Sequence, residues 1–382
     1  MNRSQRDLIC LLKNSISHVH EKLDTVDYAE IKRIAVNHAC LPLVYDGAVK
    51  AGLVPPESWE QHAIFVAANN YKNLTVQAEI LAKLAENHIR HAVLKGISVS
   101  RYYPEPLYRP LGDIDILVEE KDYERAITLI SGSADRKEEH YGHEFHYCFL
   151  YKGIHVEIHR QVTEFASDTQ GKKLCEHFSH ALDNLEEGQY DTFRFPALSP
   201  AFQIVSLLVH TQRHFIFHKS TLRMLCDFAV FAQSIEEKVW CSSVLPVLTD
   251  MGLLPFAETL CRVAEKYLGI TLSFSVGRKI TEELVDSLLE GFLEDGIYKT
   301  YGPTPKKNVL TTIKSLFCAV SELAKRRYTI LKKHPALLPV FIVYIPLVKL
   351  WKTLLGRKSN LAVLDYSMNR YKREALAKKL KI

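Results

Sequence analysis

The alternating segment Asp-Ile-Asp-Ile-Leu-Val at residues 113–118 constrains the fold of this chain more than any other feature. Its period of two and its β-branched side chains are typical of a strand with one buried face. Asp113 and Asp115 would then project from the same face of the strand, a few ångströms apart. Two neighbouring anions repel each other unless a cation lies between them. The segment therefore predicts a β-strand with a metal site on its polar face.

The surrounding segments predict a small α/β core over residues 86–165. Short apolar runs indicate strands, and stretches with a helical period indicate the helices between them. The expected elements are a strand over 89–94, a short helix over 97–102, the strand over 113–118, a helix over 122–130, and strands over 147–151 and 154–158. The last two strands form a hairpin across Lys152-Gly153.

The rest of the chain is predicted to be helical, because apolar residues recur at three- and four-residue steps. Two prolines at positions 55 and 56 indicate the start of a helix. Strong helical patterns cover residues 203–210, 222–233 and 282–293, and the period is expected to stay helical from about Glu164 onward. The fold class is therefore α+β. Its expected parts are an N-terminal helical region at 1–85, the core at 86–165, a larger helical domain at 166–334, and an apolar, then basic, segment at 335–382.

The charge of the chain is unevenly distributed. Residues 323–382 carry 15 Lys and Arg against two acids, whereas residues 1–322 have a net charge of −8. A basic segment of this kind favours phosphate-bearing partners, either nucleic acid or an anionic membrane surface. The apolar stretch 335–351 contains three prolines and is too interrupted for a membrane-spanning helix. Three interpretations stay open for this region, namely packing on the helical domain, contact with a membrane surface, and contact with RNA.

The cysteines and the N-terminus bear on localisation. Eight cysteines are scattered through the sequence without a CxxC pair, which argues against a zinc ribbon or a disulfide framework. The N-terminal segment lacks the long apolar stretch of a signal peptide. We expect a cytoplasmic protein, with peripheral contact to the inner face of the membrane as an option for the basic segment.

A third carboxylate accompanies the aspartate pair. Glu157 lies in a second strand candidate, Ile-His-Val-Glu-Ile-His at 154–159. Carboxylates with room for water and substrate phosphates suit Mg²⁺, or Mn²⁺ in its place. Three carboxylates on adjacent strands can hold two such ions. Removal of one anion from the crowded pair, as in Asp115→Asn, is expected to change stability by less than about 1 kcal/mol.

Other nucleotide-binding and hydrolase motifs are missing from the sequence. There is no GxGxxG, no GxxxxGK[ST] and no GxSxG. A Rossmann domain, a P-loop NTPase and an α/β-hydrolase are therefore excluded as interpretations.

Three motifs together resemble the nucleotidyltransferase superfamily of the DNA polymerase β type. They are Val-Leu-Lys-Gly-Ile at 93–97, Arg-Pro-Leu-Gly-Asp-Ile-Asp-Ile-Leu-Val at 109–118, and Val-Glu-Ile-His at 156–159. More narrowly, they are similar to a bacterial branch described as uncharacterised nucleotidyltransferases, often found among cell-surface polysaccharide genes. The helical segments at 210–214 and 222–227 also resemble that branch, and the resemblance covers about residues 60–235.

The resemblance implies roles for individual residues. Asp113 and Asp115 match its metal-binding pair, and Glu157 matches its third carboxylate. The residues expected to contact the nucleotide are Lys95, Gly96, Ser98, Arg109 and Gly112. Many superfamily members have Gly-Ser where this chain has Lys95-Gly96, so the lysine is the candidate for the triphosphate charge, and Ser98 lies two residues late. Arg109 is expected either to contact a phosphate oxygen or to lie exposed in a turn.

Several further residues are candidates for the surroundings of the cleft. His155 and His159 share a strand face with Glu157 and either orient the site or are structural. His210, His214 and His218 recur along one helix face, where a polar lining of the cleft is favoured over zinc because no HExxH glutamate is present. Asp227 either closes the cleft or pairs with Arg223. His140, His143 and His146 are expected to be solvated.

The resemblance implies transfer of a nucleoside monophosphate from an NTP to an unidentified hydroxyl or phosphate acceptor, with release of pyrophosphate. A role in cell-surface polysaccharide metabolism is one option for the acceptor. Two alternatives remain open, a toxin-type nucleotidyltransferase that modifies tRNA and a non-catalytic scaffold that retains the fold.

Overall fold

The computed structural model of the protein describes residues 1–137, 145–162, 169–217, 220–277, 280–297, 335–341 and 344. They belong to two compact units. The first unit comprises Met1–Gln212, Lys219–Tyr298 and Leu380–Ile382, and the second comprises Arg213–His218 and Lys299–Lys379.

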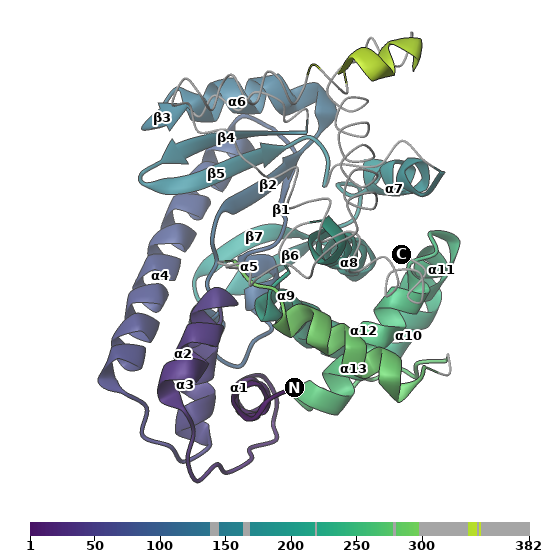
Figure 1. Ribbon diagram of the computed structural model, residues 1–382. Helices are drawn as coiled ribbons and strands as arrows, with labels where there is room; N and C mark the ends of the chain where they lie inside the picture. Colours follow the sequence, from purple (N-terminus) through teal and green to yellow (C-terminus); the bar gives the residue numbers. More distant parts are fainter. Residues whose placement is uncertain are drawn as a thin grey trace. The chain divides into compact units, whose positions relative to one another are not determined.

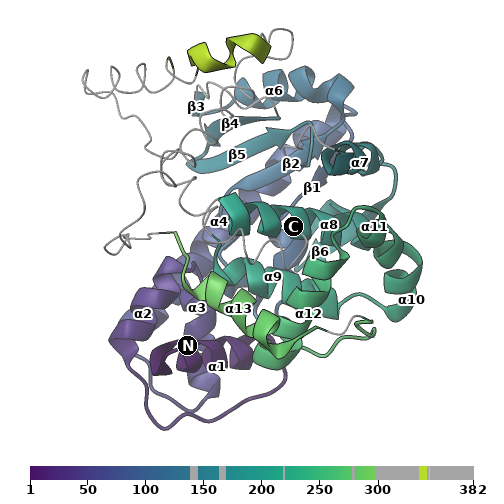
Figure 2. The same ribbon diagram turned by 45° about the vertical axis from the view of Figure 1, so that its right-hand side comes forward.

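Helices precede the sheet along the chain (Figures 1 and 2). They are α1 (Arg3–Ile16), α2 (Tyr28–Asn37), α3 (Leu41–Lys50) and α4 (Glu57–Glu86). Helix α4 begins directly after Pro56, as the sequence predicts, and carries acidic residues in its first turn. Helix α1 packs closely on α3 at Gly47, where a Cβ atom would lie 1.8 Å from the Leu11 carbonyl oxygen. Helices α1 to α4 thus lie in the region that was expected to be helical.

A mixed sheet forms the centre of the first unit (Figure 1). Its strands are β1 (His91–Val93), β2 (Ile114–Val118), β3 (Arg136–Lys137), β4 (His146–Tyr151), β5 (Ile154–His159), β6 (Leu185–Tyr190) and β7 (Phe193–Leu198). Their order is β3-β4-β5-β2-β1-β7-β6 among the described residues. Strand β2 is antiparallel to β1 and parallel to β5, and β4 and β5 form the predicted hairpin.

The two faces of the sheet differ in chemistry. Alternate residues of β2 and β5, such as Ile116 and Ile158, join an apolar core with Leu81 of α4 and Ile130 of α6 (Tyr123–Ser131). The intervening residues of the same strands therefore project from the opposite face. That opposite face carries the acidic and histidine side chains of the candidate site.

The expectation of a helical period from about Glu164 onward is wrong at 185–198. Strands β6 and β7 form an antiparallel hairpin there, and Val93 of β1 pairs with Ala197 of β7 in parallel. The sheet therefore extends beyond the expected 86–165 core. Two glutamates and a glycine in β6, and Pro196 in β7, give this hairpin a weak strand signal in the sequence.

The remaining elements of the first unit are short helices around the sheet and a helical C-terminal part. They are α5 (Ile97–Ser100), η1 (Pro106–Tyr108), η2 (Glu120–Asp122), α7 (Thr169–Ser179), α8 (Pro200–Phe217), α9 (Leu222–Gln233), α10 (Glu237–Val239), η3 (Trp240–Val244), α11 (Leu245–Asp250), α12 (Leu254–Leu268) and α13 (Glu282–Leu293). The last residues of α8 fall in the second unit. Helices α9 and α13 have the bounds that the sequence predicts.

The second unit includes the turn η4 (Pro335–Leu337) and helical residues 338–341. Most of the basic segment 323–382, including the predicted partner-binding residues, lies outside the described residues. Within the described part of the chain, every helix is too short or too polar to cross a membrane.

Candidate metal and nucleotide site

The predicted acidic residues of β2 and β5 come together on the polar face of the sheet. Asp115 and Glu157 are direct register partners on the two parallel strands. Their ligand oxygens and the His159 Nε2 atom all lie within 4.8 Å of one another. The sheet order thus places the third carboxylate beside the strand that bears the aspartates.

His159 connects the two carboxylates. Its Nε2 atom lies 3.0 Å from Asp115 Oδ1 and 3.1 Å from Glu157 Oε2. Burial alone would lower the pKa of His159, but the hydrogen bonds to Asp115 and Glu157 outweigh burial and raise it. These contacts favour the protonated form of His159, which carries positive charge between the two carboxylates.

Lys95 also contacts Asp115. Its Nζ atom lies 3.3 Å from the same Oδ1 atom that His159 approaches. Burial would raise the pKa of Asp115, yet Lys95 and His159 reverse that effect and hold it well below its usual range. Glu157 behaves similarly, since its bond to His159 outweighs burial and lowers the pKa.

Asp113 lies just before β2 and is exposed. Partial loss of hydration raises the pKa of its carboxyl, and the negative charges of Asp115 and Glu157 raise it further. It belongs to neither of the groups of metal-ligating atoms that the described residues form. Asp113 thus lies beside the site, where added positive charge would relieve its repulsion from the other two carboxylates.

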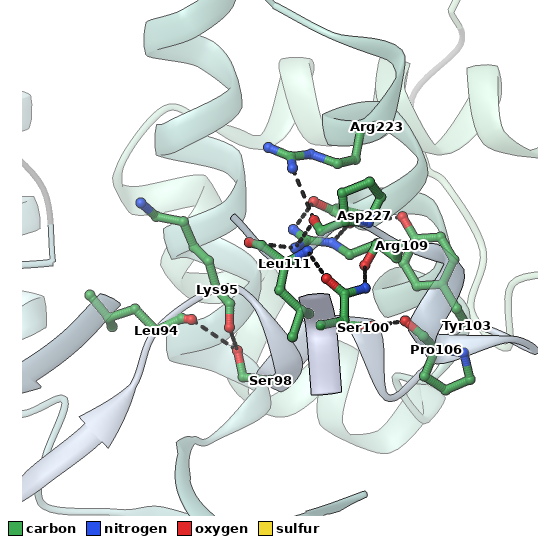
Figure 3. A network of polar contacts seen from close by, with 12 residues as sticks. Leu94, Lys95, Ser98, Ser100, Tyr103, Pro106, Arg109, Leu111, Arg223 and Asp227 are labelled. Carbon is green, nitrogen blue, oxygen red and sulfur yellow. Dashed lines mark hydrogen bonds and ion pairs between the residues drawn. The ribbon is translucent and has the colours of Figure 1, made fainter. Parts of the chain in front are cut away.

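The predicted phosphate-binding turn follows β1 (Figure 3). Gly96 has a φ of 57°, which favours glycine, and a Cβ atom there would meet nothing within 4 Å. Ser98 is buried, and its hydroxyl donates to the carbonyl oxygens of Leu94 and Lys95, at 3.0 Å and 2.8 Å. The Ser98 hydroxyl therefore stabilises the turn, and we do not propose Ser98 as a phosphate ligand.

Arg109 and Asp227 form a buried ion pair behind this turn (Figure 3). The guanidinium donates from Nε and Nη2 to the two carboxylate oxygens, at 2.9 Å and 2.6 Å. Tyr103 adds a hydrogen bond of 2.7 Å to Asp227 Oδ1. Burial would raise the pKa of Asp227, but Arg109 outweighs it and lowers that pKa.

The interpretation of Arg109 as an exposed turn arginine is wrong, because only 3% of the residue is exposed. Its guanidinium donates to Asp227 and to the backbone carbonyls of Pro110 and Leu111. We therefore do not propose Arg109 as a phosphate ligand. The expected pairing of Asp227 with Arg223 is also corrected. Arg223 donates to the Pro110 carbonyl, and the direct salt bridge of Asp227 is with Arg109.

The loop before β2 is held by asparagines of α4. Asn70 donates to the carbonyls of Leu107 and Arg109 and accepts from the Leu111 amide. Asn73 donates to the carbonyl of Gly112, which has a φ of 76°. These contacts fix the backbone immediately before the aspartates. Gly112 allows the turn there, because its φ is positive.

Two further side chains of the site lie on β4. His146 pairs with His159 across the hairpin, and their rings stack at 5.0 Å. Cys148 pairs with Glu157, and its thiol donates to Glu157 Oε1 at 3.6 Å. The expectation of a solvated His146 is therefore wrong. The spacing His-Tyr-Cys opposite Glu-Ile-His could have revealed this arrangement, since both strands alternate with a period of two.

The other predicted cleft residues are distributed around the site. His155 is exposed and lies close enough to Asp113 to oppose part of the rise in the pKa of that carboxyl. His210 of α8 similarly lowers the pKa of Asp115. His214 follows one turn later on α8, and His140, His143 and His218 lie outside the described residues. Neither group of metal-ligating atoms in the described residues includes a histidine of α8.

Comparison with known families bears on the whole arrangement. A search among curated proteins gave no match. A family model described as an uncharacterised nucleotidyltransferase matches residues 24–269, which include all of the sheet and the described site. The chain belongs to this family of uncharacterised nucleotidyltransferases.

Proposed function

We propose that this protein transfers a nucleoside monophosphate from an NTP to a hydroxyl or phosphate acceptor, with a divalent metal ion bound at Asp113, Asp115 and Glu157. The observation that carries the proposal is the convergence of Asp115 and Glu157 on one point, the Nε2 atom of His159. Family membership supports the reaction class. We also infer that the sheet is a core of the polymerase β type.

The residues present fit Mg²⁺ or Mn²⁺. Carboxylate oxygens are the protein ligands that these ions prefer, and Mg²⁺ commonly uses one or two of them with waters and substrate phosphates. Partial loss of hydration raises the pKa of Asp113, and the negative charges of Asp115 and Glu157 raise it further, so the carboxylate lies in a region of excess negative charge. A bound divalent ion would relieve this excess and would take the place of the positive charge that Lys95 and His159 now supply to Asp115.

Each residue of the site has a role in the proposed reaction. Bound metal would lower the pKa of the acceptor hydroxyl and offset the charge of the leaving pyrophosphate. Asp113 and Asp115 would hold the metal, and Glu157 would complete the ligand set on the acceptor side. Lys95, which is partly exposed, would move its ammonium group from Asp115 to the triphosphate.

The bond changes follow from this arrangement. The acceptor oxygen forms a bond to the α-phosphorus, and the bond from that phosphorus to the oxygen bridging the β-phosphate breaks. The bonding electron pair leaves with pyrophosphate, and the acceptor hydroxyl releases its proton to solvent. Gly96 lets the backbone approach a phosphate at the turn after β1, because the space beside its Cα is open.

Incubation of the protein with each α-labelled NTP, Mg²⁺ and fractionated cell extract identifies the acceptor class. Label in a carbohydrate fraction would support a role in polysaccharide metabolism, and label in tRNA would support the toxin-type alternative. Absence of protein-dependent label in every fraction would favour a non-catalytic scaffold. Asp115→Asn serves as the control, because any label that persists with this variant comes from another enzyme.

A further inference from the structure

We infer that His146, Cys148 and Glu157 form a second metal site, which takes a zinc-class transition metal ion rather than Mg²⁺. The three side chains come from the adjacent strands β4 and β5 and project from the same face of the sheet. Their ligand atoms lie within 4.8 Å of one another. This site lies beside the carboxylate site of the proposed function, and Glu157 is common to both.

The spacing of the ligand atoms suits one ion. Cys148 Sγ lies 3.6 Å from Glu157 Oε1, and His146 Nε2 lies 3.8 Å from Glu157 Oε2. Two ligands of one tetrahedral zinc ion are about 3.3–3.6 Å apart, given zinc bonds of about 2.0–2.3 Å. Small side-chain rotations are therefore enough to bring the three groups onto one ion.

The chemistry of the donors selects the metal. Thiolate and imidazole ligands favour zinc and related transition metals, whereas Mg²⁺ takes oxygen ligands. Binding requires that Cys148 release its thiol proton to solvent and that His146 bind as the neutral imidazole. A thiolate and one carboxylate would together balance the charge of a divalent ion.

The side chains around Glu157 differ from those around Asp115. On the opposite side, Lys95 and His159 neutralise Asp115. In the described part of the chain, the ion pairs of Glu157 are with the histidines His146 and His159, not with lysine or arginine. His146 and Glu157 are partly exposed, with 20% and 25% of their side chains accessible, so an ion and a water ligand can enter from solvent. Three protein ligands would leave a fourth position open.

Cobalt titration of the full-length, metal-stripped protein tests this inference. We expect one equivalent of Co²⁺ to produce a thiolate-to-cobalt absorption band that Zn²⁺ abolishes and a large excess of Mg²⁺ leaves unchanged. Cys148→Ser should remove the band, whereas Cys241→Ser, at an exposed cysteine in η3, should keep it. Failure of one equivalent of Co²⁺ to produce the band would overturn the inference, as would its persistence in Cys148→Ser.

A second variant tests the same site independently, in case Cys148→Ser does not fold. His146→Gln changes a partly exposed side chain and should weaken Zn²⁺ binding by at least about tenfold, since loss of groups that merely support metal ligands already costs about that much. His180→Gln, at an exposed histidine, is its matched control. Unchanged Zn²⁺ affinity in folded His146→Gln would contradict the site.

Asp115→Asn separates this inference from the proposed function. The variant should lose nucleotidyl transfer and keep the cobalt band, because Asp115 is not among the three ligands. Loss of the band in Asp115→Asn would place the ion at the carboxylate site and overturn the inference. Absence of transfer in the wild-type protein, with the band present, would instead count against the proposed function alone.

Discussion

Asp115 and Glu157 are register partners on the parallel strands β2 and β5, and one oxygen of each lies within 3.1 Å of His159 Nε2. The carboxylates are thus held together by a histidine that burial alone would keep neutral. The relationship explains how two carboxylates share one face of the sheet: positive side chains compensate their charge.

The two aspartates are predicted to respond differently to neutralisation. Asp115 is stabilised as an anion by Lys95 and His159, so Asp115→Asn should lower the free energy of unfolding by about 1–3 kcal/mol. Asp113 is destabilised as an anion, so Asp113→Asn should leave the melting temperature unchanged or raise it. This prediction replaces the expectation, based on the sequence, that Asp115→Asn would relieve repulsion at little cost, because Lys95 and His159 contact Asp115. Urea unfolding with a chelator present measures both effects, and equal stabilities of the two variants would contradict the charge assignment.

The buried pair of Arg109 and Asp227 is predicted to be essential for stability. Arg109→Met leaves an uncompensated carboxylate in the interior and should cost about 3–5 kcal/mol of unfolding free energy. The double variant Arg109→Met with Asp227→Leu should recover part of this loss, because it removes both charges. Denaturant unfolding of the single and double variants gives the coupling energy.

An exposed ion pair provides the matched control for Arg109. Arg194 and Glu187 pair on the β6–β7 hairpin with 65% of each side chain accessible. Arg194→Met should therefore leave stability almost unchanged. A loss as large as that of Arg109→Met would show that removal of any arginine, rather than of the buried pair, destabilises the fold.

Lys95 is predicted to act on the nucleotide more than on the acceptor. Its ammonium group now contacts Asp115 Oδ1, and a metal ion bound there would release it toward the triphosphate. Lys95→Ala should weaken NTP binding at low salt and leave acceptor binding nearly unchanged, as calorimetry can determine. Equal NTP affinity of the variant and the wild-type protein would show that Lys95 only compensates the charge of Asp115.

His38 is predicted to make the protein sensitive to mild acid. Burial lowers its pKa to about 4, and the opposing effect of Asp295 is smaller. The unfolded chain, with a histidine pKa of about 6.5, then binds more protons than the folded chain between those values. Stability should therefore fall by roughly 2 kcal/mol through this residue as the pH drops from about 7 to about 5.

A substitution isolates the contribution of His38. His38 Nδ1 accepts a hydrogen bond from the Leu222 amide at 3.3 Å, and the Oδ1 atom of Asn can replace that acceptor. The difference in unfolding free energy between pH 7 and pH 5 should be smaller in His38→Asn than in the wild-type protein. An identical pH dependence in both proteins would refute this assignment.

Local patterns were enough to predict much of the fold. The alternation of Asp113–Val118, the hairpin turn at Lys152-Gly153 and the prolines before α4 each indicate one element, and the structure contains all three. The hairpin of β6 and β7 was missed, because Glu186, Glu187 and Pro196 suppress its strand signal.

Long-range pairing was not predictable from the sequence. Arg109 and Asp227 are 118 positions apart, and neither lies in a pattern that identifies the other. His146 was expected to be solvated, and Cys148 had no predicted role in the site. The register of the predicted hairpin, with Tyr151 opposite Ile154, places both residues beside Glu157 and His159 and could have identified them.

The most direct test of the proposed nucleotidyl transfer compares α-labelled and γ-labelled NTP in a reaction with Mg²⁺ and the acceptor fraction. Nucleotidyl transfer should place the α label in the acceptor and release the γ label in pyrophosphate. Asp115→Asn should abolish the transfer, while Asp250→Asn, at an exposed carboxylate outside the site, should retain it. Transfer of the γ label to the acceptor, or undiminished transfer by Asp115→Asn, would contradict nucleotidyl transfer at this site.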